Sequence, residues 1–273
     1  MVMKLDGKTA LITGSTDGVG RMVAQRLAAA GARVLIHGRD TDRGRRVVGD
    51  ISKAGGTAEL LPADLGSLAE VRRLADTVRQ RETRLDILIN NAGIGTAGAS
   101  RQTSADGHEL RFAVNYLAGF LLTRLLLPLI KASTPARIVN VSSAGQQALD
   151  FDDVMLTRDY SGRRAYCQSK LAQIIFTIHL AQELADDGVT VNALHPATYM
   201  DTAMVRRAGV TPMSSVDDGA EAILNLAASP DLAVCSGRYF NGLREARADR
   251  QAYDDAARRR LMEISLELTA AYR

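Results

Sequence analysis

The stretch "RRAYCQSK", residues 163–170, places Tyr166 four positions before Lys170. Residues four apart on a helix lie on the same face, so a phenol and an ammonium would stand side by side here. An unperturbed tyrosine has a pKa of about 10, and a cation within a few ångströms favours its phenolate by about 1–3 pH units. The pair could therefore exchange a proton with a bound oxygen near neutral pH. On its own the spacing is weak evidence, because an exposed pair of this kind is usually ordinary surface.

The segments around this pair alternate between short apolar runs and amphipathic stretches, which is typical of strands that cross over through helices to a parallel sheet. The expected strands are 8–13, 33–37, 57–61, 85–89, 136–141, 189–194 and 238–240. The expected helices are about 18–30, 41–54, 67–82, 106–132, 160–187, 216–228 and 248–270. The sequence thus predicts one α/β domain over residues 1–273, a single-domain Rossmann fold with a doubly wound parallel sheet of about seven strands flanked by helices. Two segments without a clear period, near 143–159 and 196–215, are expected to be substrate loops.

Composition narrows the class of protein. With 273 residues, 46% hydrophobic and 24% charged, the chain can bury one large core. The net charge of +3 comes from interspersed acids and bases, which argues against nucleic-acid binding. The most apolar stretch, "YLAGFLLTRLLLPLI", contains Arg124 and Pro128, and no signal peptide is evident, so we expect a cytoplasmic protein with no membrane partner. The two cysteines, Cys167 and Cys235, and the four histidines lack metal-ligand spacing, so no metal is expected.

A glycine-rich turn follows the first expected strand. The sequence "TGSTDGVG" leads into a helix, and glycine lets the backbone approach a phosphate while the helix N-terminus offers free amides and positive dipole. This order of strand, loop and helix predicts a nucleotide-diphosphate cradle, although the spacing differs from GxGxxG. The cradle residues are Gly14, Ser15, Thr16, Gly18, Val19 and Gly20.

The end of the second expected strand carries the signal for cofactor type. Dinucleotide sites that hold an unphosphorylated ribose usually place an acid here, whereas "IHGRD" places Arg39. The donor fork of arginine matches a 2′-phosphate, and Arg43 lies one helical turn further on, so NADP(H) is predicted over NAD(H). The alternative is a solvated Arg39 with Asp40 turned to the ribose. Asp64, after the third strand, is expected either to bond the adenine amino group or to cap the following helix.

In motif order the chain resembles the short-chain dehydrogenase/reductase family: "TGSTDGVG", "ADL", "NNAG", "VNYL", "VNVSSAG" and "YCQSK". The resemblance implies that Tyr166 protonates the substrate oxygen while a nicotinamide delivers hydride to carbon. Lys170 would tune this phenol and hold the nicotinamide ribose. Ser143, rather than Ser142, would bond the substrate carbonyl, and Asn115 would hold a water next to the lysine.

The same resemblance extends the expected cofactor site to Leu65 and to Asn91, Ala92 and Gly93. After the sixth strand the family commonly has a Pro-Gly pair followed by a threonine that contacts the nicotinamide carboxamide. Here "HPATYMDT" offers Pro196 with either Thr198 or Thr202, and Ala197 replaces the glycine. Spacing favours Thr202, whose alternative role is to cap a short helix at 203–207. Alanine disfavours positive φ, which puts the local geometry in question.

The long segment between Ser143 and Tyr166 resembles the retinol-dehydrogenase-like branch, which implies hydrophobic carbonyls or alcohols as substrates. Because no leading membrane anchor is recognised, we expect a soluble bacterial-type reductase of lipophilic or polyketide-like ketones, a role in secondary metabolism. An apolar pocket is expected from Ile94, Phe151, Val154, Met155, Leu156, Tyr160, Tyr199, Met200, Met204 and Met213. Ordinary packing of these residues is the alternative.

Other functions within the resemblance are a nucleotide-sensing binding protein that no longer turns over, a reductase of carbon–carbon double bonds, or an epimerase. An intact set of Tyr166, Lys170, Ser143 and Asn115 disfavours the sensor. The expected partners are a small-molecule carbonyl or alcohol and, through the helix faces at 106–132 and 160–187, further copies of the chain in a homodimer or homotetramer.

Overall fold

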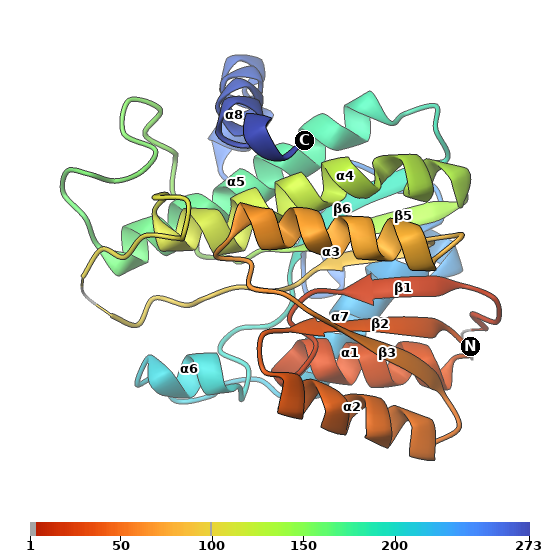
Figure 1. The fold of residues 1–273 in the computed structure, drawn as a ribbon. Coiled ribbons are helices and arrows are strands. Elements are labelled where there is room, and N and C mark those ends of the chain that lie inside the picture. The colour runs from red at the N-terminus through yellow and green to blue at the C-terminus, as the bar shows by residue number, and fades with distance from the viewer. Residues whose placement is uncertain (1–3, 99) are drawn as a thin grey trace.

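The computed structural model describes residues 4–98 and 100–273, and its centre is one eight-stranded sheet (Figure 1). The strands run in the order β3-β2-β1-β4-β5-β6-β7-β8. Their bounds are β1 Thr9–Ile12, β2 Arg33–Gly38, β3 Thr57–Pro62, β4 Ile87–Asn90, β5 Ala136–Val141, β6 Val189–His195, β7 Tyr239–Asn241 and β8 Arg244–Ala246. All neighbours pair in parallel except β7 with β8. The predicted single α/β Rossmann domain is confirmed.

Helices cover both faces of the sheet. One layer holds α1 Gly18–Ala29, α2 Thr41–Lys53 and α7 Val216–Ala228; the other holds α3 Leu68–Arg81, α4 Ala118–Ala132 and α5 Gly162–Glu183. Successive side chains of a strand point to opposite faces of the sheet, so each strand packs against both layers. In β1, Ala10 and Ile12 pack with the first layer, and Leu11 packs with the second. The order β2-β1-β4 places the reversal of strand order between β1 and β4, where ligands bind in open α/β sheets.

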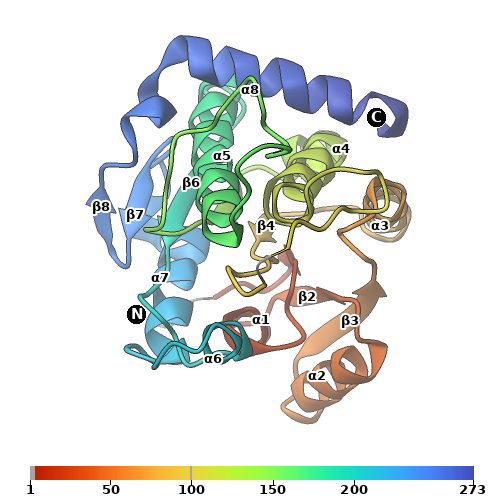
Figure 2. The same cartoon turned by 90° about the vertical axis from the view of Figure 1, so that its left-hand side faces the viewer.

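The last helix, α8 Asp255–Leu268, adds a further layer on one side. Figures 1 and 2 show it lying across the outer side of α4 and α5. Leu261 and Met262 join the core beneath it, and the hydroxyls of Tyr116 and Ser265 hydrogen-bond at 2.6 Å. The C-terminus therefore buries part of the face that these two helices would otherwise present to solvent.

Several predicted boundaries were wrong. The eighth strand was missed because Arg244–Ala246 is a three-residue edge strand with no apolar run. The helix expected from residue 106 begins after Gly107, whose φ of +80° interrupts it, and its first part is a π-helical turn at Phe112–Leu117. The helix expected over 248–270 is shorter, because a 3₁₀ turn at Arg250–Tyr253 precedes α8.

The segment Phe112–Ala132 is long and apolar enough to cross a membrane by length and composition, but 72% of its most apolar window is buried inside the fold. Phe112, Tyr116 and Phe120 form an aromatic cluster there with Phe176 of α5. The segment thus serves as a core helix in this structure.

Candidate active site

The predicted site residues gather at the carboxyl ends of β1, β4, β5 and β6. The glycine turn follows β1, Asn91 follows β4, Ser143 follows β5 and Pro196 follows β6. Tyr166 and Lys170 lie in the first turns of α5, which begins after the Ser161 side chain accepts a hydrogen bond from the Arg164 amide. One edge of the sheet therefore brings together segments far apart in the sequence.

The glycine turn has the geometry of a phosphate cradle. Gly14 has a φ of +66°, and a Cβ on Gly20 would lie 2.4 Å from the Gly14 carbonyl oxygen, so neither position accepts a larger residue without a shift. Asn91 fastens the turn by donating from Nδ2 to the carbonyl of Thr13 at 2.8 Å. The first amides of α1 have no partner within the helix, so they and the helix dipole suit an anion. These residues fit the diphosphate of a dinucleotide.

Sequence reasoning missed His37, which supports this turn. Its Nδ1 accepts a hydrogen bond from the Gly14 amide at 3.2 Å. Burial lowers the pKa of His37 to about 4, so the ring is neutral at physiological pH and can accept this bond. The only signal in the sequence was a polar residue inside an apolar strand.

Two residues expected to contact the cofactor, Ser15 and Leu65, have side chains that bond or pack within the protein. Ser15 is fully buried, donates to the Ile12 carbonyl at 2.8 Å and accepts from the His37 amide. Leu65 is 5% exposed and packs in the core. At these two positions only the backbone is left to face a nucleotide.

At the adenosine end, Arg39 and Arg43 lie among carboxylates. The Arg39 side chain is 70% exposed and stands 3.8 Å from Asp64, while Arg43 pairs with Asp40 at 3.1 Å and Asp17 at 3.4 Å. Asp40 caps α2 by accepting from the Arg43 amide at 2.9 Å. This contact disfavours the alternative in which Asp40 turns to a ribose.

The alternative role of Asp64 as a helix cap was wrong. Ser67 caps α3, accepting from the Glu70 amide. Asp64 instead accepts from the Gly66 amide at 2.9 Å and closes a turn, with its other oxygen toward Arg39.

Tyr166, Ser143 and Lys170 lie close together. A Cβ on Gly145 would lie 3.5 Å from Ser143 Oγ and 3.7 Å from Tyr166 Cε1, so both side chains flank this glycine, and the Lys170 Nζ lies 5.8 Å from the centre of the Tyr166 ring. Ser142 is buried and donates to the Lys170 carbonyl at 2.7 Å, so its hydroxyl is occupied and the geometry favours Ser143. Tyr239 of β7, which sequence reasoning missed, holds Ser143 by donating to its carbonyl at 3.1 Å.

Lys170 is anchored from beneath. Its Nζ donates to the Val141 carbonyl at 2.8 Å and to the Gln173 Oε1 at 2.9 Å, all within the buried interior. Gln173 lies one turn after Lys170 on α5 and was not singled out in the sequence. Burial lowers the pKa of Lys170 to about 7, because no anion compensates the desolvated ammonium.

The expected lowering of the Tyr166 pKa by Lys170 was wrong for this structure. Burial raises the pKa of Tyr166, and the nearby Ser143 hydroxyl acts in the opposite direction. The physical reason is that both groups are desolvated, and a lysine with a pKa of about 7 carries only part of a positive charge at neutral pH.

The depressed pKa of Lys170 predicts a pH-dependent stability. Below about pH 7 the lysine is protonated in both the folded and the unfolded state, so the cost of burying its charge is fully present. Above that pH the folded state releases the proton, while the unfolded state keeps it up to about pH 10.4. From pH 7 to 9, the unfolding free energy of the wild type should therefore rise by about 2 kcal/mol relative to Lys170→Met, measured by urea denaturation. A constant difference, or a fall, contradicts this pKa.

Asn115 lies in the π-helical turn and is held on two sides. Its Oδ1 accepts from the Ile94 amide at 2.7 Å, and its Nδ2 donates to Ser169 Oγ at 2.9 Å. A Cβ on Gly93 would lie 3.2 Å from this Oδ1 and 3.5 Å from Lys170 Nζ. Asn115 thus joins the segment after β4 to the lysine helix, and the predicted group of four lies in one place.

The expected apolar pocket is not assembled as predicted. Phe151, Val154 and Met155 pack against the core of the α4–α5 layer, and Leu156 is 1% exposed. Ordinary packing, the alternative, describes them better. Tyr160 belongs to a polar clamp, since the Arg111 guanidinium bonds its hydroxyl at 2.5 Å and the Ala97 carbonyl at 2.7 Å.

The 196–215 segment forms a roof over the glycine turn. It contains α6 Ala203–Arg207, capped by Thr202, whose methyl would lie 3.4 Å from a Cβ on Gly18. Thr202 therefore takes the alternative role of helix cap, and its methyl also lies near the glycine turn; its contact with the nicotinamide stays a prediction. Thr198 instead bonds His195 Nε2 at 3.1 Å.

Ala197, which replaces the glycine of the family pattern, does not have to adopt a positive φ in this structure. Among the non-glycine residues that the structure describes, positive φ occurs at Leu156, Asp159 and Tyr199, and Ala197 does not share it. The left-handed turn after β6 thus falls on Tyr199, with a φ of +46°, two residues later than the replaced glycine.

Comparison with known proteins shows the family to which the chain belongs. The family model for short chain dehydrogenases matches residues 8–211, and the chain belongs to this family of oxidoreductases. It is 38% identical to human retinol dehydrogenase 13, over 97% of this chain and 85% of that protein. The resemblance to the retinol-dehydrogenase-like branch is thus confirmed.

Solved structures agree with the fold. A crystal structure of an uncharacterized protein from Mycobacterium paratuberculosis has a TM-score of 0.83 and 30% identity, covering 98% of this chain and 96% of that one. The landomycin C-6 ketoreductase LanV, with bound NADP and rabelomycin, has a TM-score of 0.71 and 29% identity, covering 88% and 96%. Together with the cradle, these relatives support a nicotinamide cofactor.

Proposed function

We propose that the protein is an NADP(H)-dependent reductase that interconverts a carbonyl and a secondary alcohol, and that it reduces a lipophilic or polyketide-like ketone in secondary metabolism. The observation that carries the proposal is the joint position of Tyr166, Ser143 and Lys170 at the strand edge that also holds the glycine cradle. A phenol, a hydroxyl and a lysine at such a place suit proton transfer to a carbonyl oxygen.

In the mechanism, the nicotinamide, when bound, supplies or accepts a hydride at the substrate carbon. Ser143 Oγ donates a hydrogen bond that orients the substrate oxygen, and Tyr166 gives its proton to that oxygen. Because burial raises the pKa of Tyr166, the neutral phenol is the resting form, which is the form a general acid needs in the reductive direction. Lys170, with a pKa of about 7, can take up or release the compensating proton.

Cradle residues Gly14, Gly18, Val19 and Gly20, with Thr16, would hold the diphosphate; Asn91, Ala92, Gly93, Pro196 and Thr202 would line the nicotinamide half, and Asp64 the adenine. This assignment rests on their positions around the strand edge. Lys170 and Tyr166 would face the nicotinamide ribose.

The preference for NADP(H) rests on Arg39 and Arg43. Arg39→Ala is expected to weaken NADPH binding about tenfold or more and NADH binding by less than about twofold, because only NADPH carries the 2′-phosphate that a guanidinium bonds bidentately. Dissociation constants from isothermal titration calorimetry check this. Equal losses for both cofactors would mean that the phosphate is recognised elsewhere.

The substrate class rests on the names of relatives, a retinol dehydrogenase and a ketoreductase bound to rabelomycin. Oxidation of NADPH in the presence of a panel of aromatic and aliphatic ketones, followed by the absorbance of the reduced nicotinamide, tests the proposal directly. Cofactor binding without turnover of any carbonyl would favour the alternative of a non-catalytic nucleotide sensor. Turnover of enones at the double bond alone would favour a C=C reductase.

A cytoplasmic location, the absence of a membrane partner, and assembly as a homodimer or homotetramer remain part of this proposal. The α4 and α5 faces considered for assembly are partly covered by α8, so such a dimer would use their uncovered part or include α8 in the contact.

A further inference from the structure

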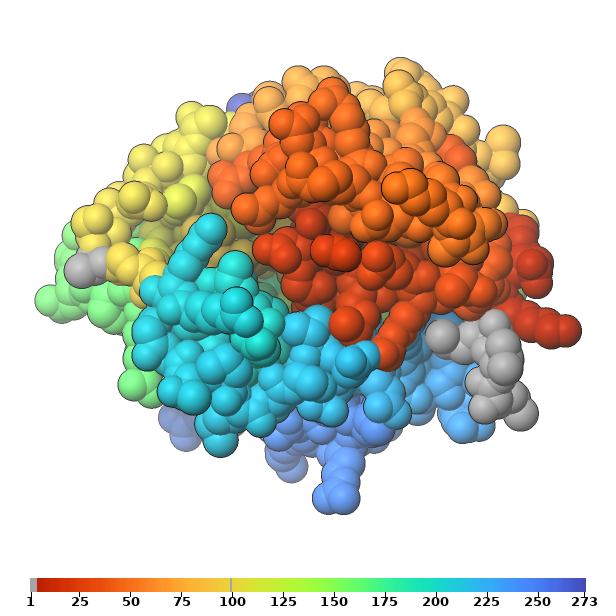
Figure 3. Space-filling view, turned by 90° about the horizontal axis from the view of Figure 1, so that it is seen from below, coloured from red at the N-terminus to blue at the C-terminus, as the bar shows by residue number. Residues whose placement is uncertain are grey.

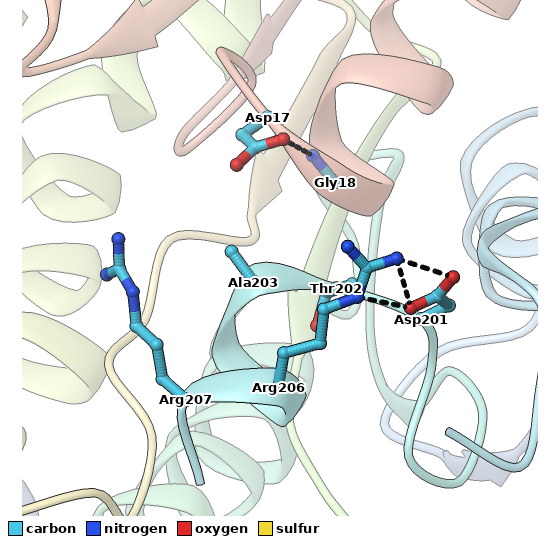
Figure 4. Close-up of a pocket in the computed structure, with 7 residues that line it drawn as sticks. All are labelled: Asp17, Gly18, Asp201, Thr202, Ala203, Arg206 and Arg207. Atoms are coloured by element: carbon cyan, nitrogen blue, oxygen red, sulfur yellow. Dashed lines mark hydrogen bonds and ion pairs between the residues drawn. The ribbon is translucent and has the colours of Figure 1, made fainter. Parts of the chain in front are cut away.

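A hollow of about 380 Å³, lined by charged side chains, lies between the glycine turn and the roof segment. Its walls are Asp17 and Gly18 on one side and Asp201, Thr202, Ala203, Arg206 and Arg207 on the other (Figure 4). Figure 3 shows the same two parts of the chain side by side, the roof in cyan and the first strand–helix unit in red. The hollow therefore lies directly against the start of α1, where the cradle presents its amides.

The roof is held in this place by close contacts. A Cβ on Gly95 would lie 2.8 Å from Met204 of α6, and one on Gly219 would lie 2.1 Å from the Met200 sulfur, so both glycines are notches for roof side chains. The backbone of Asp201 also bonds the Ser214 carbonyl at 3.1 Å, which closes the base of the segment. These contacts fix α6 over the cradle.

The two arginines of α6 differ in their partners. Arg206 is engaged by Asp201 through two bonds, Nε to Oδ1 at 2.8 Å and Nη2 to Oδ2 at 2.9 Å. Arg207 makes no ion pair or hydrogen bond with any residue that the structure describes, and Figure 4 shows it on the far side of the hollow from that pair. Arg207 is thus the cation of the roof that is free to bind.

Both carboxylates that line the hollow already have hydrogen-bond or ion-pair partners. Asp201 is taken by Arg206, and Asp17 accepts from the Gly18 amide with one oxygen and pairs with Arg43 through the other. What remains is Arg207 on one wall and the positive end of α1 on the opposite wall. With both acids paired, Arg207 and the amides at the start of α1 face each other across the hollow and suit a ligand with negative charge on both sides, as a diphosphate has.

We propose that Arg207 binds the diphosphate of the dinucleotide, so that α6 completes the phosphate site opposite the glycine cradle. The inference rests on the proposed function and adds to it a cofactor contact outside the motifs singled out in the sequence. Because the diphosphate is common to both cofactors, Arg207 contributes to binding without selecting between NADPH and NADH.

The test compares dissociation constants of NADPH and NADH, by isothermal titration calorimetry, for the wild type and two variants. Arg207→Met is expected to weaken both cofactors equally, by about 10-fold, as for a lost hydrogen bond to a charged group. The control, Arg260→Met, removes one exposed arginine on α8 that does not line the hollow, and should leave both constants within about twofold. Raising the salt concentration should reduce the effect of Arg207→Met.

An Arg207→Met variant that binds both cofactors like the wild type overturns the inference, as does a loss for NADPH alone or an equal loss in the control. If the wild type binds neither cofactor, the proposed function itself fails. If the wild type binds and Arg207→Met is unaffected, only the role of Arg207 fails. Partial recovery of binding in Arg207→Lys supports a charge contact.

Discussion

Tyr166→Phe is expected to lower turnover with NADPH and a ketone by at least about 100-fold, while the dissociation constant of NADPH changes by less than about twofold. General acids contribute about 10²–10⁴-fold, and this substitution removes only the hydroxyl that would donate the proton. The Tyr166 ring lies with Ser143 beside Gly145, and the phenylalanine ring would keep this place on α5. Steady-state kinetics together with calorimetric binding separate the two effects.

A matched control is Tyr253→Phe, since Tyr253 is 38% exposed and lies in the 3₁₀ turn before α8. It should retain turnover within about twofold, as surface substitutions usually change stability little. Near-normal turnover in Tyr166→Phe would refute its assignment as the acid. Loss of NADPH binding in that variant would instead indicate a role in holding the cofactor.

Gly20→Ala is expected to abolish measurable cofactor binding at concentrations that saturate the wild type, and to destabilise the fold by about 1–3 kcal/mol. The added Cβ would lie 2.4 Å from the Gly14 carbonyl oxygen and 2.5 Å from Asn91 Nδ2, so the glycine turn and its fastening must both shift. Those are the groups that shape the cradle. Calorimetric binding and urea denaturation measure the two consequences.

Gly49→Ala is the matched control, because it adds the same methyl group at an open position. Gly49 lies in α2, and a Cβ there would meet nothing within 4 Å. Alanine is favoured over glycine in a helix by about 0.5–1 kcal/mol, so this variant should be more stable and should bind NADPH normally. If Gly20→Ala behaved like Gly49→Ala, the close approach at the cradle would have no functional meaning.

The elements that sequence reasoning found are those with strong local patterns. The β1 run "KTALIT" and the amphipathic α3 carry their periods in consecutive residues, and the glycine turn between β1 and α1 combines three features in order. Sequence reasoning missed the elements whose local patterns are weak. The β8 strand has three residues and is defined by its partner β7. The π-helical turn at Asn115 depends on packing against α5, which no local pattern records.

The candidate site divides in the same way. Tyr166 and Lys170 share one helix, so their spacing was visible, whereas the pKa of Lys170 depends on its burial, which only the tertiary fold sets. The roles of Phe151 and Met155 were misjudged because an apolar loop residue can either line a pocket or pack in the core, and only the tertiary fold decides. Arg207 carried no motif, since its position over the cradle comes from notches at Gly95 and Gly219.

The position of the C-terminal helix α8 affects how two copies of the chain could associate. Its apolar residues Leu261 and Met262 pack on the flank of the helix that bears Tyr166, and the hydrogen bond between the Tyr116 and Ser265 hydroxyls holds α8 there. A second copy that approached this flank would therefore meet α8 as well as α4 and α5. Removing α8 would uncover apolar surface beside the helix that bears Tyr166.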